Sequence, residues 1–172
     1  MNITIREIQL KDIPHLVDYW TKSDKEHLIN MGVDLSKLPK EEEFKGMLES
    51  QISQPYTQKQ NYALIVLADN SPIGHVNINE IDFGNSAKMH LHLWDKSNRK
   101  SGIGTQMIQL ALPLFFENFQ LKQLICEPYA KNDAPNKTLE KVGFQFVKKY
   151  TSVPGSINFE QEVNQWQLIK NN

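Results

Sequence analysis

The sequence predicts an α/β protein in which a single mixed β-sheet carries helices on both faces. Two kinds of segment support this fold class. Short runs of alternating or continuous apolar residues, typical of strands, occur near both ends and in the middle of the 172-residue chain. Longer segments between them place apolar residues at helical spacing. The predicted order of elements is βααβββαβαββ, which favours a mixed sheet covered by helices.

The first sixty residues are predicted to form one strand and two helices. Residues 2–8 alternate apolar and polar side chains, as a strand does. Asp12-Ile13-Pro14 favours a helix start, because proline is tolerated in the first turn, and this helix should run to about Trp20. After a loosely patterned stretch, Pro39 and the acidic run 41–43 favour a second helix, since acidic side chains suit its positive end. Its apolar residues at helical spacing are Phe44, Met47, Leu48 and Ile52.

The middle of the chain is predicted to hold three strands and a long helix. The strands are residues 62–67, 73–81 and 88–94, joined by turns at 69–72 and 84–86. The helix starts near Ile103 and carries an apolar face as far as Phe115. Pro113 should kink or loosen its second half.

The last part of the chain is predicted to contain a strand, a short helix and two closing strands. These are residues 121–126, 132–142, 144–150 and 163–169, with Gly143 ending the helix. No repeat, low-complexity tract or linker interrupts the pattern, so residues 1–172 are expected to be one domain.

Composition excludes several classes of function as defaults. A formal net charge of −1 gives no global basic field for nucleic acid. No stretch approaches the roughly 20 apolar residues of a membrane-spanning helix. Cys126 is the one cysteine, so no intrachain disulfide is possible; the thiol is expected to be buried and inert, and the location cytoplasmic. Neither nucleic acid nor a membrane is expected as a partner.

The loop before the long helix has features of an anion site. It contains Arg99-x-x-Gly102-x-Gly104 between a strand and a helix. A helix N-terminus presents unpaired N–H groups and partial positive charge, and glycines allow an anion to approach closely. Lys96, Arg99 and Lys100 add charge. The loop is neither a Walker A loop nor a complete dinucleotide fingerprint, which has a small residue where Met107 stands. Taken alone, it is equally compatible with a plain strand-to-helix turn.

A second segment supports a specific interpretation of the loop. Residues 132–144, Asn-Asp-Ala-Pro-Asn-Lys-Thr-Leu-Glu-Lys-Val-Gly-Phe, resemble the N-x-x-(S)-x-x-x-(L/Y)-E-K-x-G-F segment of the GNAT acetyltransferase superfamily. The loop resembles that family's (Q/R)-x-x-G-x-(G/A) acetyl-CoA motif. The two motifs lie within residues 88–146. Leu139 is similar to the branch pattern that includes ribosomal-protein N-terminal acetyltransferases, because that branch also has Leu at this position. The resemblance implies an N-acetyltransferase that transfers acetyl from acetyl-CoA, by direct attack, to a primary amine of a small molecule or protein N-terminus.

The resemblance also implies how acetyl-CoA is held. The backbone of Arg99, Lys100, Ser101, Gly102, Ile103 and Gly104 would cradle the pyrophosphate. The strand 88–94 would pair with the pantetheine arm, and Leu93 or Trp94 would offer an N–H to the thioester oxygen. Asn132 would bond the cofactor near its sulfur, although a helix N-cap is an equal alternative.

The sequence departs from the family pattern around the thiol. Many members have a Tyr where Leu139 stands, and it protonates the leaving thiolate. The N-terminal acetyltransferase branch has a Ser where Pro135 stands. Lys100 also replaces a common loop glycine. Tyr129, just past a predicted strand, is a candidate replacement acid.

Histidines on two neighbouring strands are candidate bases, because an amine attacks only when it is unprotonated. With period two, Lys88, His90 and His92 share one strand face. His75, Asn77 and Asn79 form a polar face on the adjacent strand, opposite Val76, Ile78 and Glu80. A histidine pKa near neutrality suits a base at physiological pH. His90 or His92 is the predicted base, with Glu80 acting through water as the next candidate.

Three alternatives stay open at this point. The histidines are equally compatible with structural hydrogen bonding on a partly solvated sheet face. A metal-dependent enzyme would use His90 and His92 with His75 or Glu80 as a third ligand, although no metal is expected. A module that senses acyl-CoA would bind it without turnover. A homodimer is a candidate assembly.

Overall fold

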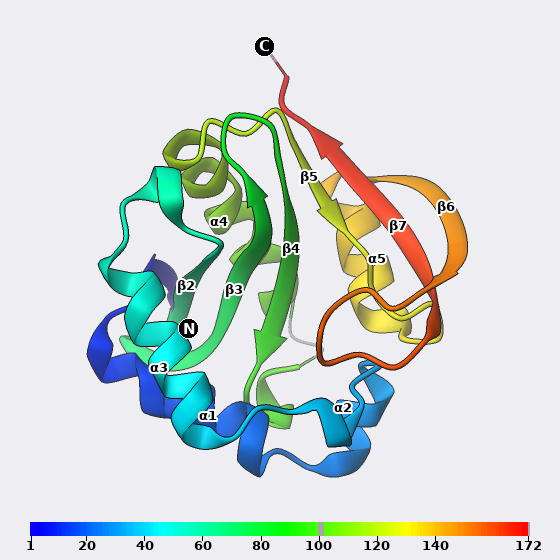
Figure 1. Ribbon diagram of the computed structural model, residues 1–172. Coiled ribbons are helices and arrows are strands. Elements are labelled where there is room, and N and C mark those ends of the chain that lie inside the picture. The colour runs from blue at the N-terminus through cyan, green and yellow to red at the C-terminus, as the bar shows by residue number, and fades with distance from the viewer. Residues whose placement is uncertain (100–101, 172) are drawn as a thin grey trace.

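The computed structural model describes residues 1–99 and 102–171, and its centre is one seven-stranded mixed sheet. The strand order is β1-β2-β3-β4-β5-β7-β6 (Figure 1). Neighbouring strands are antiparallel except β4 and β5, which run parallel. The predicted α/β class and mixed sheet are therefore confirmed. Lys100 and Ser101, for which the family resemblance implies a place in the pyrophosphate cradle, lie outside the described residues.

The elements follow the predicted order with one addition. The strands are β1 (Ile3–Glu7), β2 (Asn61–Ala68), β3 (Ser71–Asp82), β4 (Ser86–Leu93), β5 (Gln123–Cys126), β6 (Gln145–Ser152) and β7 (Gln161–Ile169). The helices are α1 (Ile13–Lys22), α2 (Lys25–Asn30), α3 (Glu41–Ser53), α4 (Ile103–Asn118) and α5 (Asp133–Val142). The sequence analysis missed α2, which has six residues and therefore too few turns to show a period. The side chain of Asp24 accepts from the Glu26 N–H and so caps the N-terminus of α2.

Helices cover both faces of the sheet (Figure 1). On one face, α1 and α3 pack over β2 in a cluster of Ile13, Leu16, Val17, Leu48, Ala63 and Ile65. On the other, α4 buries Met107, Ile108 and Phe115 against strand residues that include Leu64, Ile78 and Met89. The helix continues through Pro113 to Asn118. None of the helices in the described part of the chain is both long and apolar enough to cross a membrane.

β4 and β5 diverge along their length. Their parallel ladder consists of Ser86 with Gln123, Ala87 with Leu124, and Lys88 with Ile125. Beyond Lys88 the two strands separate toward the end at which α1 and α2 lie (Figure 1). The last five residues of β4 therefore have no ladder partner on the β5 side within the described chain.

Candidate active site

The two motif glycines at the start of α4 have different roles. Gly102 is the N-cap and has a φ of +78°, which strongly favours glycine. Gly104 lies one residue after the buried Ile103, and its backbone does not require glycine. A Cβ there would meet Thr138 Cγ2 at 3.6 Å, an ordinary contact. Neither packing nor strain therefore explains Gly104, and the missing Cβ leaves space beside the helix N-terminus.

The free edge of β4 is defined by its backbone hydrogen bonds. The thiol of Cys126 donates to the Met89 carbonyl at 3.0 Å, so the peptide groups of Met89 face β5. Because orientation repeats every two residues, the peptide groups of Leu91 and Leu93 face the same gap. The Trp94 N–H instead donates to the Ile73 carbonyl on the β3 side at 3.0 Å. The Trp94 N–H is therefore engaged by β3, whereas the peptide group of Leu93 faces the gap, so of the two residues Leu93 stays the candidate thioester donor.

Arg99 uses its side chain within the protein. Its guanidinium donates to the Leu93 carbonyl at 3.1 Å and lies 3.1 Å from each ring nitrogen of His27. Part of the positive charge expected around the loop is therefore engaged between the end of β4 and α2. Only the backbone of Arg99 remains a candidate for the cradle.

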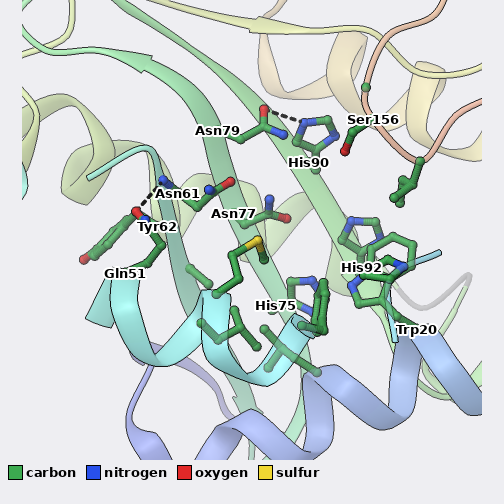
Figure 2. A pocket seen from close by; sticks show the side chains of 18 of the residues that line it. Trp20, Gln51, Asn61, Tyr62, His75, Asn77, Asn79, His90, His92 and Ser156 are labelled. Carbon is green, nitrogen blue, oxygen red and sulfur yellow. Dashed lines mark hydrogen bonds between the residues drawn. The ribbon is translucent and has the colours of Figure 1, made fainter. Parts of the chain in front are cut away.

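A cavity of about 410 Å³ lies on the opposite side of β4 from α4. Its walls come from α1, α3, the segment 31–39 and the β6–β7 loop. Its floor is the polar face of β2, β3 and β4, shown in Figure 2, with Asn61, His75, Asn77, Asn79, His90 and His92. The register pairs His75 with His92, Asn77 with His90 and Asn79 with Lys88. The shared face predicted from strand period is confirmed.

Each histidine of the floor has a hydrogen-bond partner. His75 is buried, and its Nδ1 accepts from the Trp94 indole N–H at 2.8 Å. The Nε2 of His90 lies 3.0 Å from Asn79 Oδ1. The rings of His75 and His92 stack with centroids 4.6 Å apart.

His92 belongs to a chain of hydrogen bonds that leaves the cavity. Its Nδ1 is 3.2 Å from the Tyr19 hydroxyl, which is also 3.2 Å from His27 Nε2. Tyr19 and His27 line a second, open pocket between α1, α2 and the end of β4. Sequence reasoning missed both residues. Tyr19 lies on the apolar face of α1 with Leu16 and is indistinguishable there from a core residue, and His27 lies on the unpredicted α2.

Burial makes the three floor histidines weaker bases than expected. Loss of hydration, with a smaller effect of His90, lowers the pKa of His75 to about 3. Loss of hydration and the nearby Lys88 lower the pKa of His90 to about 4. Desolvation and the neighbouring histidines lower the pKa of His92 well below its usual value. The expected pKa near neutrality is wrong, and all three imidazoles are neutral at pH 7.

Neither Glu80 nor Tyr129 lines the cavity. Glu80 has a φ of +47° in the irregular stretch where the β3–β4 register shifts. This bulge turns its carboxylate toward Lys88, 3.1 Å away, which corrects its predicted place on the opposite face. Tyr129 forms an isolated bridge with Val163 and packs its ring edge against Phe159. It lies outside the cavity lining, close to where β5 ends.

Asn132 occupies the N-cap position of α5, yet its side chain makes no capping hydrogen bond. The structural hydrogen bonds near this helix start are made by Asn136 instead. Its side-chain amide donates to the Asn132 carbonyl at 2.8 Å. The Asn136 carbonyl oxygen accepts from Trp166 Nε1 at 2.8 Å and from Asn164 at 2.9 Å. Leu139 is fully buried in the core. The polar side chain of Asn132 is thus not used to cap α5.

The metal alternative finds no geometric support. Among residues 1–99 and 102–171, no three His, Cys, Asp or Glu side chains are grouped so that they could hold a metal ion. His75 and His92 stack on one another, and Glu80 pairs with Lys88.

Comparisons with known proteins agree with this geometry. The family model described as acetyltransferase (GNAT) domain matches residues 2–145. Similar solved structures include a ribosomal-protein-S5-alanine acetyltransferase from Vibrio fischeri, with 17% identity, a TM-score of 0.79 and coverage of 98% of this chain and 93% of that one. A spermidine N-acetyltransferase from Vibrio cholerae, in complex with CoA and spermine, has 16% identity, a TM-score of 0.78 and coverage of 97% and 95%.

A third similar structure is an acetyltransferase from Salmonella typhimurium that modifies the N-terminal serine of ribosomal protein L7/L12. It has 16% identity, a TM-score of 0.77 and coverage of 99% and 96%. No curated protein is significantly similar in sequence. The family match spans most of the chain, and it includes both motifs and the diverging strands. The chain belongs to the GNAT acetyltransferase family.

Proposed function

We propose that the protein transfers an acetyl group from acetyl-CoA directly to a primary amine held in the cavity above β4. The observation that carries this proposal is the double role of β4. Its free edge faces the gap toward β5, and its His90 and His92 side chains form part of the cavity floor. One strand therefore separates an extended site for the acetyl donor from a pocket for the acceptor by the width of its backbone.

Acetyl-CoA fits the residues on the donor side. The backbone of residues 99–104 would hold the pyrophosphate, with Gly104 leaving room at the helix N-terminus. The peptide groups of Leu91 would pair with the pantetheine arm, and the Leu93 N–H would polarise the thioester carbonyl, while the Leu93 carbonyl accepts from Arg99. Asn132 would bond the arm near its sulfur. The donor supplies a thioester carbonyl and a thiolate leaving group.

His92 is the proposed base. With its Nδ1 donating to the Tyr19 hydroxyl oxygen, the Nε2 of His92 keeps its lone pair. This nitrogen takes a proton from the attacking amine, and the Tyr19 hydroxyl oxygen accepts from the Nδ1–H of the resulting imidazolium. The Nε2 of His90 instead faces the Asn79 amide oxygen, which can only accept, so this nitrogen carries a proton and is not free to take one. Tyr129 stays the candidate for protonating the leaving thiolate, because it follows β5 at the diverging ends of the strands.

Two further predictions from the sequence stay open. The single buried Cys126 supports a reducing compartment, and we expect the cytoplasm. A homodimer stays a candidate assembly.

The test is release of free CoA thiol from acetyl-CoA in the presence of a panel of primary amines. We expect turnover by the wild type, and a His92→Ala variant with kcat lowered by about 10²–10⁴ and little change in KM for acetyl-CoA. His15→Ala, at an exposed histidine, is the matched control. Tight CoA binding without thiol release from any amine would contradict the proposal and favour a sensing module.

A further inference from the structure

We infer that the acceptor is a small molecule with one amine on an apolar body, and that the Asn77 side-chain oxygen holds this amine beside the histidines. This inference rests on the proposed function and specifies the substrate class of the same cavity. Three independent features of the cavity carry it: its charge, an unsatisfied hydrogen-bond acceptor on its floor, and the way its wall is closed.

The cavity lacks carboxylates. None of the described residues that line it is Asp or Glu, and it contains Lys37 and Lys59. Lys59 is buried to 8% exposure and donates to the carbonyl oxygens of Gln51 and Ile52 at the end of α3. A molecule with several ammonium groups would bury charge next to this lysine with no carboxylate in the cavity lining to pair with it, which is strongly unfavourable. The same environment favours the neutral form of a single amine, and this is the form that attacks.

Asn77 supplies the hydrogen bond that such an amine needs. Its Oδ1 is buried and has no hydrogen-bond partner. It lies on the cavity floor beside His90, its register partner, and near His75 and His92 (Figure 2). An unsatisfied buried acceptor is costly, so a ligand N–H that reaches it is rewarded. The oxygen therefore marks the position of the acceptor nitrogen.

The remaining walls suit an apolar body. The side chains over the floor are mainly apolar and come from α1 and α3: Leu16, Trp20, Phe44, Met47, Leu48 and Ile52. Their surface accommodates alkyl or aromatic groups and offers few partners for hydroxyl-rich molecules.

A hydrogen-bonded strap closes one side of the cavity. We call residues 32–37 together with residues 155–161 the strap. Asp34 N–H donates to the Ile157 carbonyl at 2.8 Å, Asn158 Nδ2 to the Gly32 carbonyl at 2.9 Å, and Lys37 Nζ to the Asn158 carbonyl at 2.8 Å. Both parts of the strap line the cavity. Hydrogen bonds hold this wall together. It therefore favours a small acceptor over a protein N-terminus, because the rest of a polypeptide chain must continue out of the cavity.

The first experiment compares kcat/KM for five acceptors with the wild-type protein and acetyl-CoA. Phenethylamine and hexylamine carry one amine, spermidine and kanamycin carry several, and a short peptide with an N-terminal serine represents a polypeptide. We expect kcat/KM for phenethylamine or hexylamine to exceed that for spermidine and kanamycin at least tenfold, and to exceed that for the peptide. Preference for spermidine, kanamycin or the peptide would overturn the inference while leaving the proposed function intact. Absence of thiol release from every acceptor, with CoA still bound, would contradict the proposed function itself.

The second experiment tests Asn77. Asn77→Leu should raise KM for the preferred monoamine about tenfold and leave KM for acetyl-CoA unchanged. Gln54→Leu is the matched control, because Gln54 Oε1 is also buried without a partner but lies outside the cavity lining. Unchanged monoamine KM in a protein that still binds CoA would refute the role of Asn77.

A second variant keeps this test decisive should Asn77→Leu fail to fold. Asn77→Asp preserves size and adds a carboxylate to the cavity floor. The ratio of kcat/KM for spermidine to that for the monoamine should rise at least tenfold. An unchanged ratio would show that charge at residue 77 does not select the acceptor.

Discussion

At the scale of single residues, the hydroxyl of Tyr19 distinguishes the two candidate bases on β4. It contacts His92 and His27 but makes no bond to His90. Tyr19→Phe keeps the ring that packs edge-on against Trp20 and His75 and removes the hydroxyl that contacts His92, His27 and Met31 Sδ. We expect kcat to fall at least tenfold with KM for acetyl-CoA unchanged, measured by thiol release. Tyr56→Phe makes the same chemical change at a hydroxyl bonded to Glu7 and serves as control. Normal kcat in Tyr19→Phe would favour His90 as the base.

The lowered histidine pKa values predict an unusual pH profile. A base works while neutral, which is above its pKa, and burial lowers the pKa of His90 to about 4 and that of His92 well below its usual value. We therefore expect the kcat limb that belongs to the base to lie well below the imidazole value of about 6.5. The check is kcat measured at saturating acceptor as the pH is lowered. A limb centred near 6.5 that disappears in His92→Ala would contradict the buried, neutral state.

Truncation of two neighbouring asparagines should affect different properties, CoA affinity in one case and stability in the other. Asn132→Ala should weaken CoA binding with little change in melting temperature, because its side chain caps nothing. Asn136→Ala should lower the free energy of unfolding by about 2 kcal/mol or more, since Trp166 Nε1 and Asn164 lose their acceptor. Calorimetric titration with CoA and thermal melts of both variants decide the matter. Unaltered CoA affinity in Asn132→Ala would remove Asn132 from the donor site.

At the scale of elements, the first turn of α4 offers a sharp test of the donor site. Gly104→Val should preserve the fold, because a Cβ there makes only ordinary contacts, and it should abolish CoA binding by filling the approach to the helix N-terminus. Gly46→Val, in α3 with open space around the Cβ, controls for placing valine in a helix. CoA affinity is measured by calorimetry. A folded Gly104→Val protein with wild-type affinity would refute the pyrophosphate cradle.

Strand faces could be predicted from the sequence, and their partners could not. Period two places His90 and His92 on one face of any regular strand, so the polar floor was predictable. The strand face of Glu80 could not be predicted, because the residue lies in a bulge with positive φ. No glycine or proline in the sequence indicates this bulge. Tyr19 and His27 escaped because contacts between helices and strands distant in sequence depend on how the layers pack.

At the scale of the whole molecule, the buried histidines link stability to pH. In the unfolded chain a histidine binds a proton below about 6.5, whereas His75 and His90 stay neutral in the fold down to about 3 and 4. The stability they contribute is therefore complete above pH 6.5 and is lost as the pH falls from there toward 4. Each contributes a slope of up to about 1.4 kcal/mol per pH unit.

Urea unfolding at a series of pH values measures this slope. His75→Gln keeps an acceptor for Trp94 and should make stability less dependent on pH below 6.5. His15→Gln, at an exposed site, should not. Equal slopes in the wild type and His75→Gln would show that His75 is not the group responsible.

The divergence of β4 and β5 also has a consequence for amide hydrogen exchange. Within the described residues the ladder between the two strands has three pairs, from Ser86 with Gln123 to Lys88 with Ile125, so it does not protect the N–H groups of Leu91 and Leu93. In the free protein they should exchange fast relative to Leu64, which lies between two paired strands. CoA bound along this edge, as we propose, should slow exchange at Leu91 and Leu93 and leave Leu64 unaffected. The ligand then completes the sheet as a missing strand would, and the protein gains local order at the place where its own backbone leaves the sheet open.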